Sequence, residues 1–285
     1  MVTEPRSGSF SATFRRVTGR KTLPLGLSHG PIGSGAVTTG AQSKARPRAA
    51  IVVLAAGSGT RVGAAVNKVL LPLGGKPLLA WSVEAALAVE GVDPVVVVCR
   101  PGERERVAVA LQDSVGEREL LLIDGGGTRQ ASEQAALDLL APRIADGSID
   151  VVAVHDGARP LSAPALFSAV IDAARDAGGG VPAVPLPGLL PIDGDTPPGS
   201  LARLVGVQTP QAFRAGALAA AHASAAAAGF DGTDTAAAYA EFAPSADRTV
   251  RVVPSTPRNL KVTFAEDVRI AERLLGRAPG LSSGR

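Results

Sequence analysis

The stretch IVVLAAGSGTR, residues 51–61, joins an apolar run to a short glycine-rich segment. Five apolar residues in a row, Ile51–Ala55, are typical of a strand that is buried on both faces of a sheet. The alanines and glycines that follow let a backbone pass close to a ligand and turn its N–H groups inward. The stretch therefore predicts a buried strand that leads into a phosphate-binding loop.

Three more apolar runs follow, and amphipathic stretches separate them. The predicted strands after the first are residues 95–99, 120–123 and 151–154, and the predicted helices between them are residues 77–89, 102–112 and 130–140. This alternation predicts an α/β fold with a mostly parallel sheet, helices on both faces and right-handed crossovers. Ligands of such sheets bind beyond the carboxyl ends of the strands.

A proline-rich segment, residues 181–206, breaks this pattern with six prolines. Because proline cannot donate to a ladder, we expect an edge excursion or protruding arm at about 183–206 rather than central sheet. Regular structure resumes afterwards, with predicted helices at 214–228, 235–241 and 265–275 and a strand at 249–253. One domain is thus expected over residues 49–277, followed by a frayed C-terminus, 278–285.

The composition excludes several classes of protein. With 285 residues, 46% of them hydrophobic, the chain can bury a sizeable core, and no run of 18 apolar residues is present that could cross a membrane. The single cysteine, Cys99, excludes an intrachain disulfide and a thiolate zinc site, and we interpret it as an inert buried thiol.

The excess of basic over acidic residues is confined to the beginning of the chain. Residues 1–48 hold eight basic side chains and one acidic one, a net charge of +7, whereas the whole chain carries +3; residues 49–285 are therefore net acidic. With only 3% aromatic residues, this distribution argues against a nucleic-acid surface. We expect residues 1–48 to be a disordered basic tail, with a transit peptide and a misassigned start codon as alternatives.

The glycine-rich loop is followed by two basic residues, Arg61 and Lys68, where a triphosphate would lie. It is not a Walker A loop, because no Gly-Lys-Ser/Thr follows at the required spacing. The glycines at 57, 59 and 63 are one residue too widely spaced for a dinucleotide fingerprint, and the second strand does not end in an acidic residue.

Three later segments add polar residues that could reach the same sheet edge. The sequence GGGTRQAS (125–132) opens a helix with glycines, which suits either an anion or a base at the helix N-terminus or an ordinary tight turn with an N-cap. Asp156 ends the fourth strand, where it could hold Mg²⁺ or a ribose hydroxyl, or else form a structural ion pair with Arg159. We expect His155 to make a structural hydrogen bond. Lys261 follows the last strand and could return to this edge.

Taken together, the segments resemble the 2-C-methyl-D-erythritol 4-phosphate cytidylyltransferases of the non-mevalonate isoprenoid pathway. The resemblance covers about residues 50–275, and its pieces occur in the order of the family. The matching pieces are LAAGSGTR (54–61), Lys68, LPLGGKP (71–77), DGGGTRQAS (124–132), VHDGARP (154–160), QTPQAF (208–213) and NLKVT (259–263).

The resemblance implies a Rossmann-like fold with a dimerisation arm and an enzyme that transfers the cytidylyl group of CTP to a phosphorylated polyol. It also implies Mg²⁺ as cofactor, held by Asp156, a homodimer and a cytoplasmic location. Arg61, Lys68 and Lys261 match the catalytic residues. The positions that match nucleotide-binding residues are Ala55, Ala56, Gly57, Ser58, Gly59, Gly126, Ser132, Asp156 and Gly157. Those that match acceptor-binding residues are Arg159, Arg203, Thr209 and Lys261.

The sequence departs from the family mainly in the acceptor half. Leu201 stands where an arginine normally helps to seat the acceptor, although Arg203 could replace it if the register shifts by two residues. Pro187–Pro191 and Thr233–Thr235 also differ from the family pattern, and Asn67-Lys68-Val69 replaces the usual Pro-Lys-Gln. The alternatives are therefore another acceptor, such as ribitol 5-phosphate, and a nucleotide-binding paralogue without turnover.

Overall fold

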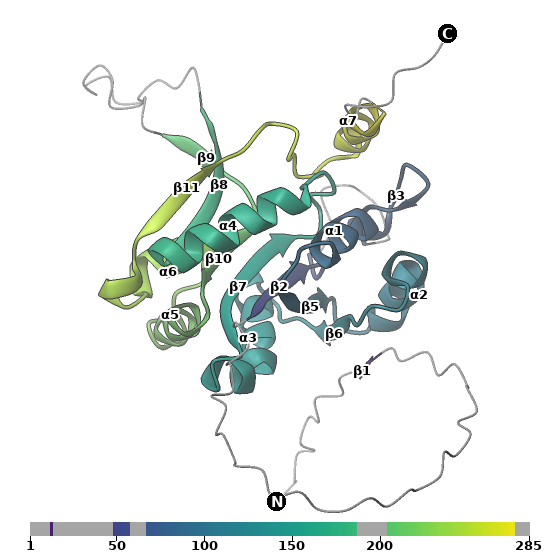
Figure 1. The fold of residues 1–285 in the computed structure, drawn as a ribbon. Coiled ribbons are helices and arrows are strands. Elements are labelled where there is room, and N and C mark those ends of the chain that lie inside the picture. The colour runs from purple at the N-terminus through teal and green to yellow at the C-terminus, as the bar shows by residue number, and fades with distance from the viewer. Residues whose placement is uncertain (1–11, 14–47, 58–66, 187–203, 277–285) are drawn as a thin grey trace, which may run out of the picture.

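The computed structural model describes residues 12–13, 48–57, 67–186 and 204–276. In this part of the chain, helices cover both faces of a nine-stranded mixed sheet (Figure 1), which confirms the predicted α/β class. The strands of this sheet are β1 (Ala12–Thr13), β2 (Arg48–Leu54), β5 (Val92–Cys99), β6 (Leu121–Asp124), β7 (Ile149–Asp156), β8 (Gly179–Pro185), β9 (Val205–Val207), β10 (Gln211–Arg214) and β11 (Val250–Pro254). The α-helices are α1 (Leu78–Leu87), α2 (Arg104–Val115), α3 (Arg129–Ala145), α4 (Pro164–Ala177), α5 (Ala215–Ala227), α6 (Thr235–Phe242) and α7 (Ala265–Leu275).

The four predicted parallel strands form one half of the sheet, in the order β6-β5-β2-β7. β2 pairs in parallel with both β5 and β7, and β5 pairs in parallel with β6. The chain therefore first builds outward from β2 to β6 and then crosses back to β7 on the other side of β2. Such a reversal opens a crevice at the carboxyl ends of the central strands, where α/β proteins bind their ligands.

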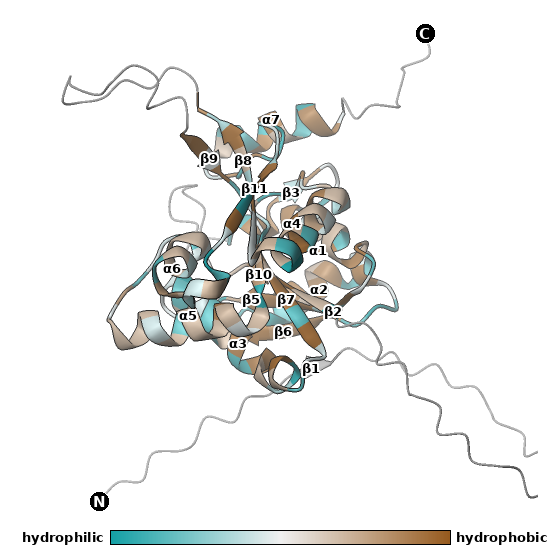
Figure 2. Ribbon diagram, turned by 60° about the vertical axis from the view of Figure 1, so that its left-hand side comes forward, coloured by the Kyte–Doolittle hydropathy of each residue, from teal (hydrophilic) through white to brown (hydrophobic). Residues whose placement is uncertain are grey.

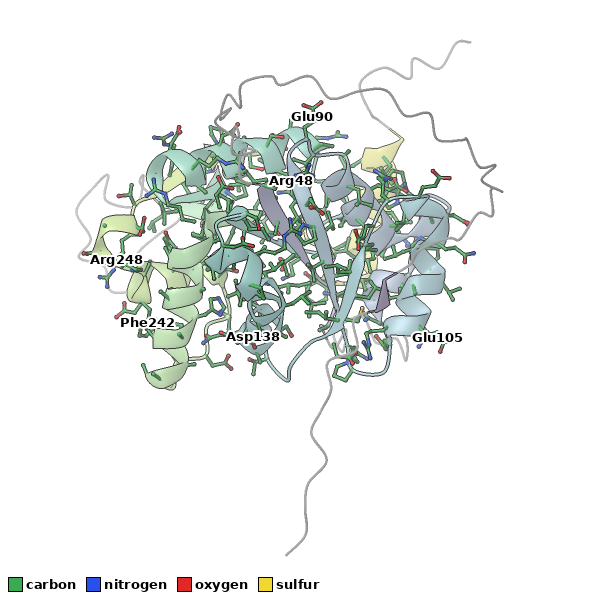
Figure 3. All side chains as sticks on the ribbon, turned by 60° about the horizontal axis from the view of Figure 1, so that its bottom comes forward. Arg48, Glu90, Glu105, Asp138, Phe242 and Arg248 are labelled. Atoms are coloured by element: carbon green, nitrogen blue, oxygen red, sulfur yellow. The ribbon has the colours of Figure 1, made fainter. Side chains whose placement is uncertain are left out.

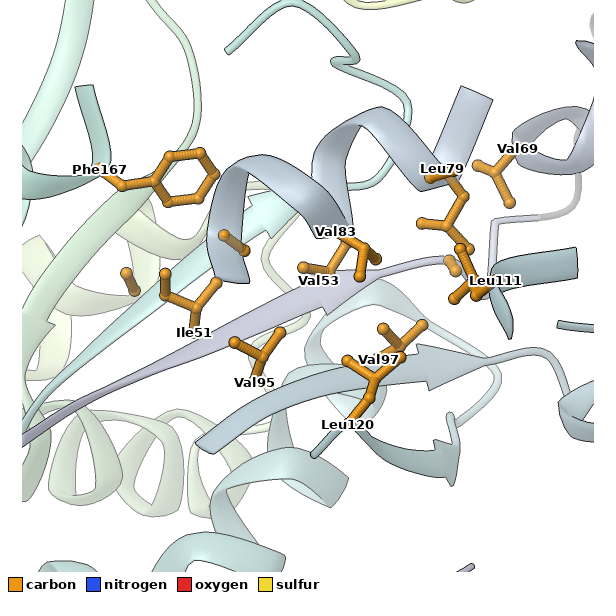
Figure 4. Packing of buried hydrophobic residues seen from close by; sticks show 14 of the residues in the cluster. Ile51, Val53, Val69, Leu79, Val83, Val95, Val97, Leu111, Leu120 and Phe167 are labelled. Atoms are coloured by element: carbon orange, nitrogen blue, oxygen red, sulfur yellow. The ribbon is translucent and has the colours of Figure 1, made fainter. Parts of the chain in front are cut away.

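Both faces of β2 are buried, as its unbroken apolar sequence predicts. Ile51 and Val53 face a core built with α1, α2 and α4, part of which is visible in Figure 4. Ala50 and Val52 point to the opposite core, where α3 and α5 pack. Each large side chain buried in this way contributes about 1.5–3 kcal/mol relative to an exposed one. The alternation fixes the strand between two helical layers.

Two elements of the other half were not predicted. α4 has Phe167, Val170, Ile171 and Ala174 on one buried face, a helical spacing that the sequence does contain. β10 is only four residues long and runs antiparallel to both β7 and β8. Together with β10, β8 and β11 extend the sheet beyond β7.

The proline-rich segment differs from the prediction in its first part. β8 lies inside the sheet between β10 and β11, although it contains Pro182 and Pro185. Proline is tolerated there because β8 changes neighbours: it pairs with β10 at Gly179 and Gly180 and with β9 from Ala183 onward. β8 and β9 then form an antiparallel ribbon that protrudes from the body (Figure 1). Residues 187–203, and Arg203 with them, lie outside the described residues.

Smaller elements complete the described part of the chain. A 3₁₀ helix, η2 (Lys68–Leu70), precedes a hairpin of β3 (Pro72–Leu73) and β4 (Lys76–Pro77), and a second one, η4 (Ser245–Asp247), precedes β11. β2 begins at Arg48, the last residue of the predicted tail. No helix among the described residues is long and apolar enough to span a membrane. The surface of the helical layers carries charged residues such as Glu90, Glu105, Asp138 and Arg248, which Figure 3 labels.

Candidate active site

A cavity of about 670 Å³ opens where the parallel strands end. Each of the four strands contributes to it, through residues at or just after its carboxyl end. The lining residues are Leu54, Ala56 and Gly57 after β2, Arg100 and Pro101 after β5, Gly125–Arg129 and Ser132 after β6, Asp156 and Ala158 after β7, with Lys68, Val69, Thr233, Lys261 and Thr263 from other segments. The crevice that the topology predicts is therefore present.

One wall of the cavity is the glycine-rich turn into α3. The Gly126 N–H donates to Ser132 Oγ over 3.2 Å, and Thr128 Oγ1 caps the helix by accepting from the Ala131 N–H. A β-carbon at Gly126 would lie 2.4 Å from the β-carbon of Ala131, so no larger residue fits without a shift. The turn thus presents bare backbone to the cavity, as a site for a flat base or an anion requires.

The charged centre of the cavity is the carboxylate of Asp156. Arg129 Nη1 lies 2.5 Å from Oδ1, and Lys261 Nζ lies 3.0 Å from Oδ2. Arg159 Nε lies 3.4 Å from the same Oδ2. Three cations from separate segments therefore converge on one carboxylate whose side chain is 8% exposed.

These contacts determine the ionisation of Asp156. Burial by itself would raise the pKa of this carboxyl, but the charges of Arg129, Lys261 and Arg159 and the hydrogen bond from Arg129 lower the pKa well below its usual value. Asp156 is therefore a carboxylate at any physiological pH. The surrounding positive charge exceeds the charge of this one carboxylate, which suits a polyanionic ligand.

A buried hydrogen-bond chain orients Asp156 from behind. The Asp156 backbone N–H donates to Thr209 Oγ1 over 2.9 Å, and that hydroxyl lies 3.2 Å from His155 Nδ1. His155 Nε2 lies 3.3 Å from the carbonyl oxygen of Arg159. Burial lowers the pKa of His155 to about 3, so the ring is neutral, and a proton on Nε2 satisfies every contact in the chain. The predicted structural role of His155 is confirmed.

A second buried chain holds Arg129. Its Nε lies 2.9 Å from Glu133 Oε1, and the Thr235 hydroxyl donates to the same oxygen over 2.8 Å. His222 Nε2 lies 3.2 Å from the other oxygen of Glu133. Arg129 is thus fixed between two carboxylates, one at the cavity and one in the protein interior.

The structure brings most of the predicted site residues together. Lys68 and Lys261 both line the cavity, and so do five predicted nucleotide-binding residues: Ala56, Gly57, Gly126, Ser132 and Asp156. Ala55 and Gly157 lie behind the cavity wall, where their N–H groups donate to the carbonyls of Val98 and Leu54. Arg61, Ser58, Gly59 and Arg203 lie outside the described residues.

Two of the predicted acceptor contacts have partners inside the protein. Arg159 Nη1 donates to the Asn259 carbonyl over 2.8 Å in addition to its contact with Asp156. Thr209 is buried and its hydroxyl belongs to the chain through His155. In this arrangement both residues orient the neighbouring groups, and their contact with an acceptor stays a prediction.

Sequence reasoning missed several polar residues of this site. Arg129 and Glu133 act through partners that are 27 to 102 residues away in the chain, so local pattern does not reveal them. Arg100 and Thr233 also line the cavity. The available signal was that Arg129 stands in the motif GGGTRQAS, which opens helix α3.

The cavity offers few ligands for a divalent cation. Among the described residues, no group of three or more His, Cys, Asp and Glu is arranged to hold a metal ion. Asp156 is the only acidic residue among the described lining residues. A single carboxylate that shares the ion with phosphate oxygens is the usual arrangement for Mg²⁺ in nucleotide enzymes, so the residues fit a magnesium ion that arrives with a triphosphate.

Comparisons with known proteins agree with this geometry. The family model described as 2-C-methyl-D-erythritol 4-phosphate cytidylyltransferase matches residues 49–277. A protein of that name from Cereibacter sphaeroides is 40% identical over 235 residues, which are 81% of this chain and 99% of the relative. A bifunctional enzyme IspD/IspF from Clavibacter michiganensis is 41% identical over 90% of this chain, and the chain spans 62% of that longer protein.

Solved structures show the same fold. The crystal structure of 4-diphosphocytidyl-2C-methyl-D-erythritol synthase from Anaerococcus prevotii superposes with a TM-score of 0.69 at 25% identity, over 81% of this chain and 97% of that one. The cytidylyltransferase from Thermus thermophilus superposes with a TM-score of 0.57 at 28% identity, over 80% and 98% of the two chains.

Proposed function

The chain belongs to the 2-C-methyl-D-erythritol 4-phosphate cytidylyltransferase family, and we propose that it transfers the cytidylyl group of CTP to 2-C-methyl-D-erythritol 4-phosphate. A phosphate oxygen of the acceptor attacks the α-phosphorus of CTP and forms a new phosphoanhydride bond. The bond between the α- and β-phosphates breaks, and pyrophosphate leaves with the electron pair. The reaction is one step of non-mevalonate isoprenoid precursor synthesis.

One observation carries the proposal: Lys68 lines the same cavity as the Asp156 carboxylate, which Arg129, Arg159 and the second lining lysine, Lys261, surround. Charge builds up on the α-phosphate oxygens as the acceptor attacks. Cations that are in place once both substrates are bound, Lys68 among them, stabilise this charge without reorganising during the chemical step. A protein that only stored nucleotide would need tight binding of CTP but no second lysine for an acceptor phosphate.

Each group in the cavity has a distinct role in the proposal. Lys68, together with Arg61 from outside the described residues, stabilises the negative charge at the α-phosphate. Lys261 breaks its ion pair with Asp156 and binds the acceptor phosphate instead. It thereby holds that phosphate close to the α-phosphorus, which reduces the entropy cost of the attack. The bare backbone at Gly126 and the hydroxyl of Ser132 lie where the cytosine and ribose are expected.

The proposal includes Mg²⁺ as cofactor. Asp156 would hold the ion together with phosphate oxygens of CTP, and the ion would neutralise charge on the departing pyrophosphate. Asp156 is deprotonated, as a metal ligand must be, and the ion would take the oxygen position that Lys261 now contacts. In titrations of the purified protein, CTP should bind more tightly with Mg²⁺ than with EDTA, and an Asp156→Asn variant should lose most of that difference.

A homodimer is also part of the proposal, and the β8–β9 ribbon supports it. Apolar side chains on the ribbon and beside it are exposed, as the hydropathy colouring of Figure 2 indicates for this region. These residues are Leu186, Leu204, Val205, Val207 and Val252. Exposed apolar patches on a strand ribbon are typical of surfaces that another protein covers. Light scattering after size exclusion should give twice the mass of the chain.

An acceptor screen tests the proposed reaction. Purified protein with CTP and Mg²⁺ should release pyrophosphate with 2-C-methyl-D-erythritol 4-phosphate, and much more slowly with ribitol 5-phosphate. Faster release with ribitol 5-phosphate would assign the other acceptor to the same chemistry. If neither acceptor gives pyrophosphate while CTP still binds, the protein is a binding protein and the proposed activity is wrong.

A further inference from the structure

The backbone that leads into Lys68 is held by the side chain of Asn67, which is only 1% exposed. Asn67 Nδ2 donates to the Ala55 carbonyl over 2.9 Å and to Glu103 Oε2 over 2.8 Å. Its Oδ1 accepts from the Val69 N–H over 3.4 Å and caps η2. Both donor hydrogens of the amide and one lone pair of its oxygen therefore form hydrogen bonds, and the three partners belong to different segments of the chain.

Glu103 connects this amide to the opposite end of the glycine-rich loop. Its Oε1 lies 3.6 Å from Arg100 Nη1, and Arg100 Nη2 donates to the Gly57 carbonyl over 2.9 Å. Gly57 and Asn67 are the described residues on either side of residues 58–66. One ion pair in the turn between β5 and α2 thus contacts both of them. We call the three residues Asn67, Glu103 and Arg100 the brace.

We infer that Asn67 and Glu103 are positioning residues for Lys68. The inference rests on the proposed function, since it concerns the lysine that is placed at the α-phosphate. Neither residue is assigned to the reacting atoms: Asn67 and Glu103 are absent from the described cavity lining, whereas Lys68 is part of it. The brace acts by fixing the direction in which the chain enters η2, and with it the place of the Lys68 side chain.

The backbone angles of Asn67 explain what the brace provides. Its φ of −55° and ψ of 121° are those of an extended residue at the start of a helical turn. A proline ring fixes φ at about −65 ± 15°, a range that includes this value. A proline at position 67 would therefore impose by covalent geometry the angle that the Asn67 amide maintains through hydrogen bonds. Proline is also the residue that the family pattern leads one to expect here.

Replacing the amide tests the inference first. Asn67→Ala should lower kcat on the order of 10- to 100-fold, because displacing a catalytic group by about 1 Å costs up to about 10²-fold in rate. KM for CTP should change less than threefold, since the lysine matters most when charge builds up. Asn67→Pro should recover most of the lost kcat. Pyrophosphate release at saturating substrates measures all three proteins.

The second test asks whether the effect of a Glu103 substitution on kcat depends on the residue at position 67. In the wild-type background, Glu103→Ala should lower kcat about 3- to 30-fold, and Glu103→Gln, whose Oε1 can still accept from Asn67, should lower kcat less. In the Asn67→Pro background, Glu103→Ala should lower kcat clearly less than in the wild-type background, because no amide remains for Glu103 to hold and only its pair with Arg100 is lost. Glu105→Gln is the matched control, since it neutralises an exposed carboxylate on the same helix.

The outcomes separate this inference from the proposed function. If the wild-type protein releases no pyrophosphate, the proposed function fails before the brace is tested. If the wild-type protein is active and Asn67→Ala retains its kcat, or if Asn67→Pro is as slow as Asn67→Ala, the brace does not position Lys68. Should Asn67→Ala fail to fold, as circular dichroism would reveal, Glu103→Ala in the two backgrounds decides the question.

Discussion

The two sides of the cavity hold their charged groups in different ways. Asp156 is buried, and it depends on charges for its position: Arg129, Arg159 and Lys261 contact its oxygens. Lys68 is more exposed, and the residue before it is held by hydrogen bonds of a neutral amide. A buried carboxylate that loses a cation is left in a medium that solvates it poorly, whereas a displaced lysine that is half-buried at the open cavity still reaches water. Changes at Asp156 should therefore affect folding, and changes at Lys68 should affect the rate.

The largest effect is expected for Arg129→Ala. This change leaves two buried carboxylates, Asp156 and Glu133, without their shared cation, and removing one partner of a buried ion pair costs about 3–5 kcal/mol. Urea denaturation at pH 7 measures the free energy of unfolding. Arg143→Ala is the control: its pair with Asp93 is partly exposed, so the loss should stay below about 1 kcal/mol. Equal losses in both variants would contradict the buried-charge side of the comparison.

Lys68→Ala tests the other side. We expect kcat to fall about 10²- to 10³-fold, the effect of removing one preorganised donor to a developing oxyanion. The free energy of unfolding should change by no more than about 1 kcal/mol, because the half-buried Lys68 opens on the cavity and its loss leaves water access to the neighbouring groups. Steady-state kinetics and urea denaturation of the same preparation give both numbers. An active Lys68→Ala protein would remove the transition-state role of this residue.

Acid should lower the free energy of unfolding through the buried groups His155 and Asp156. In the folded protein, burial lowers the pKa of His155 from 6.5 to about 3, so the unfolded chain takes up a proton in this range while the folded one does not. The free energy of unfolding should therefore fall as the pH drops from 6.5 toward 3, by at most about 1.4 kcal/mol per pH unit from this residue. Asp156, whose folded pKa is also lowered, adds to the loss only below pH 3.8. His155→Asn should show a smaller slope between pH 6.5 and 5, and an unchanged slope would rule out the buried neutral ring.

The smallest effect is expected far from both sides. Deleting residues 1–47 should leave kcat and KM within about twofold, because the only described element that it removes is the two-residue edge strand β1, and the described cavity lining starts at Leu54. Kinetics of the truncated and full-length proteins measure this. A tenfold change in either constant would give the basic N-terminal segment a part in catalysis.

The sequence predicted the parallel half of the fold well because its strands are buried on both sides. An unbroken apolar run such as Val95–Val98 is stable only where both faces of the strand are buried, so composition alone identifies it. β10 was missed because four residues carry too little pattern, and β8 was misjudged because its prolines are tolerated where its neighbour changes from β10 to β9. Tertiary pairing, which local pattern does not encode, decided both cases.

The same distinction applies to the site. Lys68, Asp156 and Lys261 were predicted because each follows a recognisable motif and parallel strands bring their ends to one edge. Arg129 and Asn67 were not, because their roles depend on Asp156 and Glu103, partners that are distant in the chain. Residues that orient other residues are visible only once the contacts are known.

The most direct measurement is ³¹P NMR of the reaction of CTP with 2-C-methyl-D-erythritol 4-phosphate and Mg²⁺, with the wild-type protein and with Lys68→Ala. Attack at the α-phosphorus predicts two coupled resonances of a new diphosphate that joins cytidine to the polyol, together with free pyrophosphate, for the wild-type protein and almost none for the variant. Release of orthophosphate from CTP, or a diphosphate that forms equally fast without Lys68, would contradict cytidylyl transfer at this cavity.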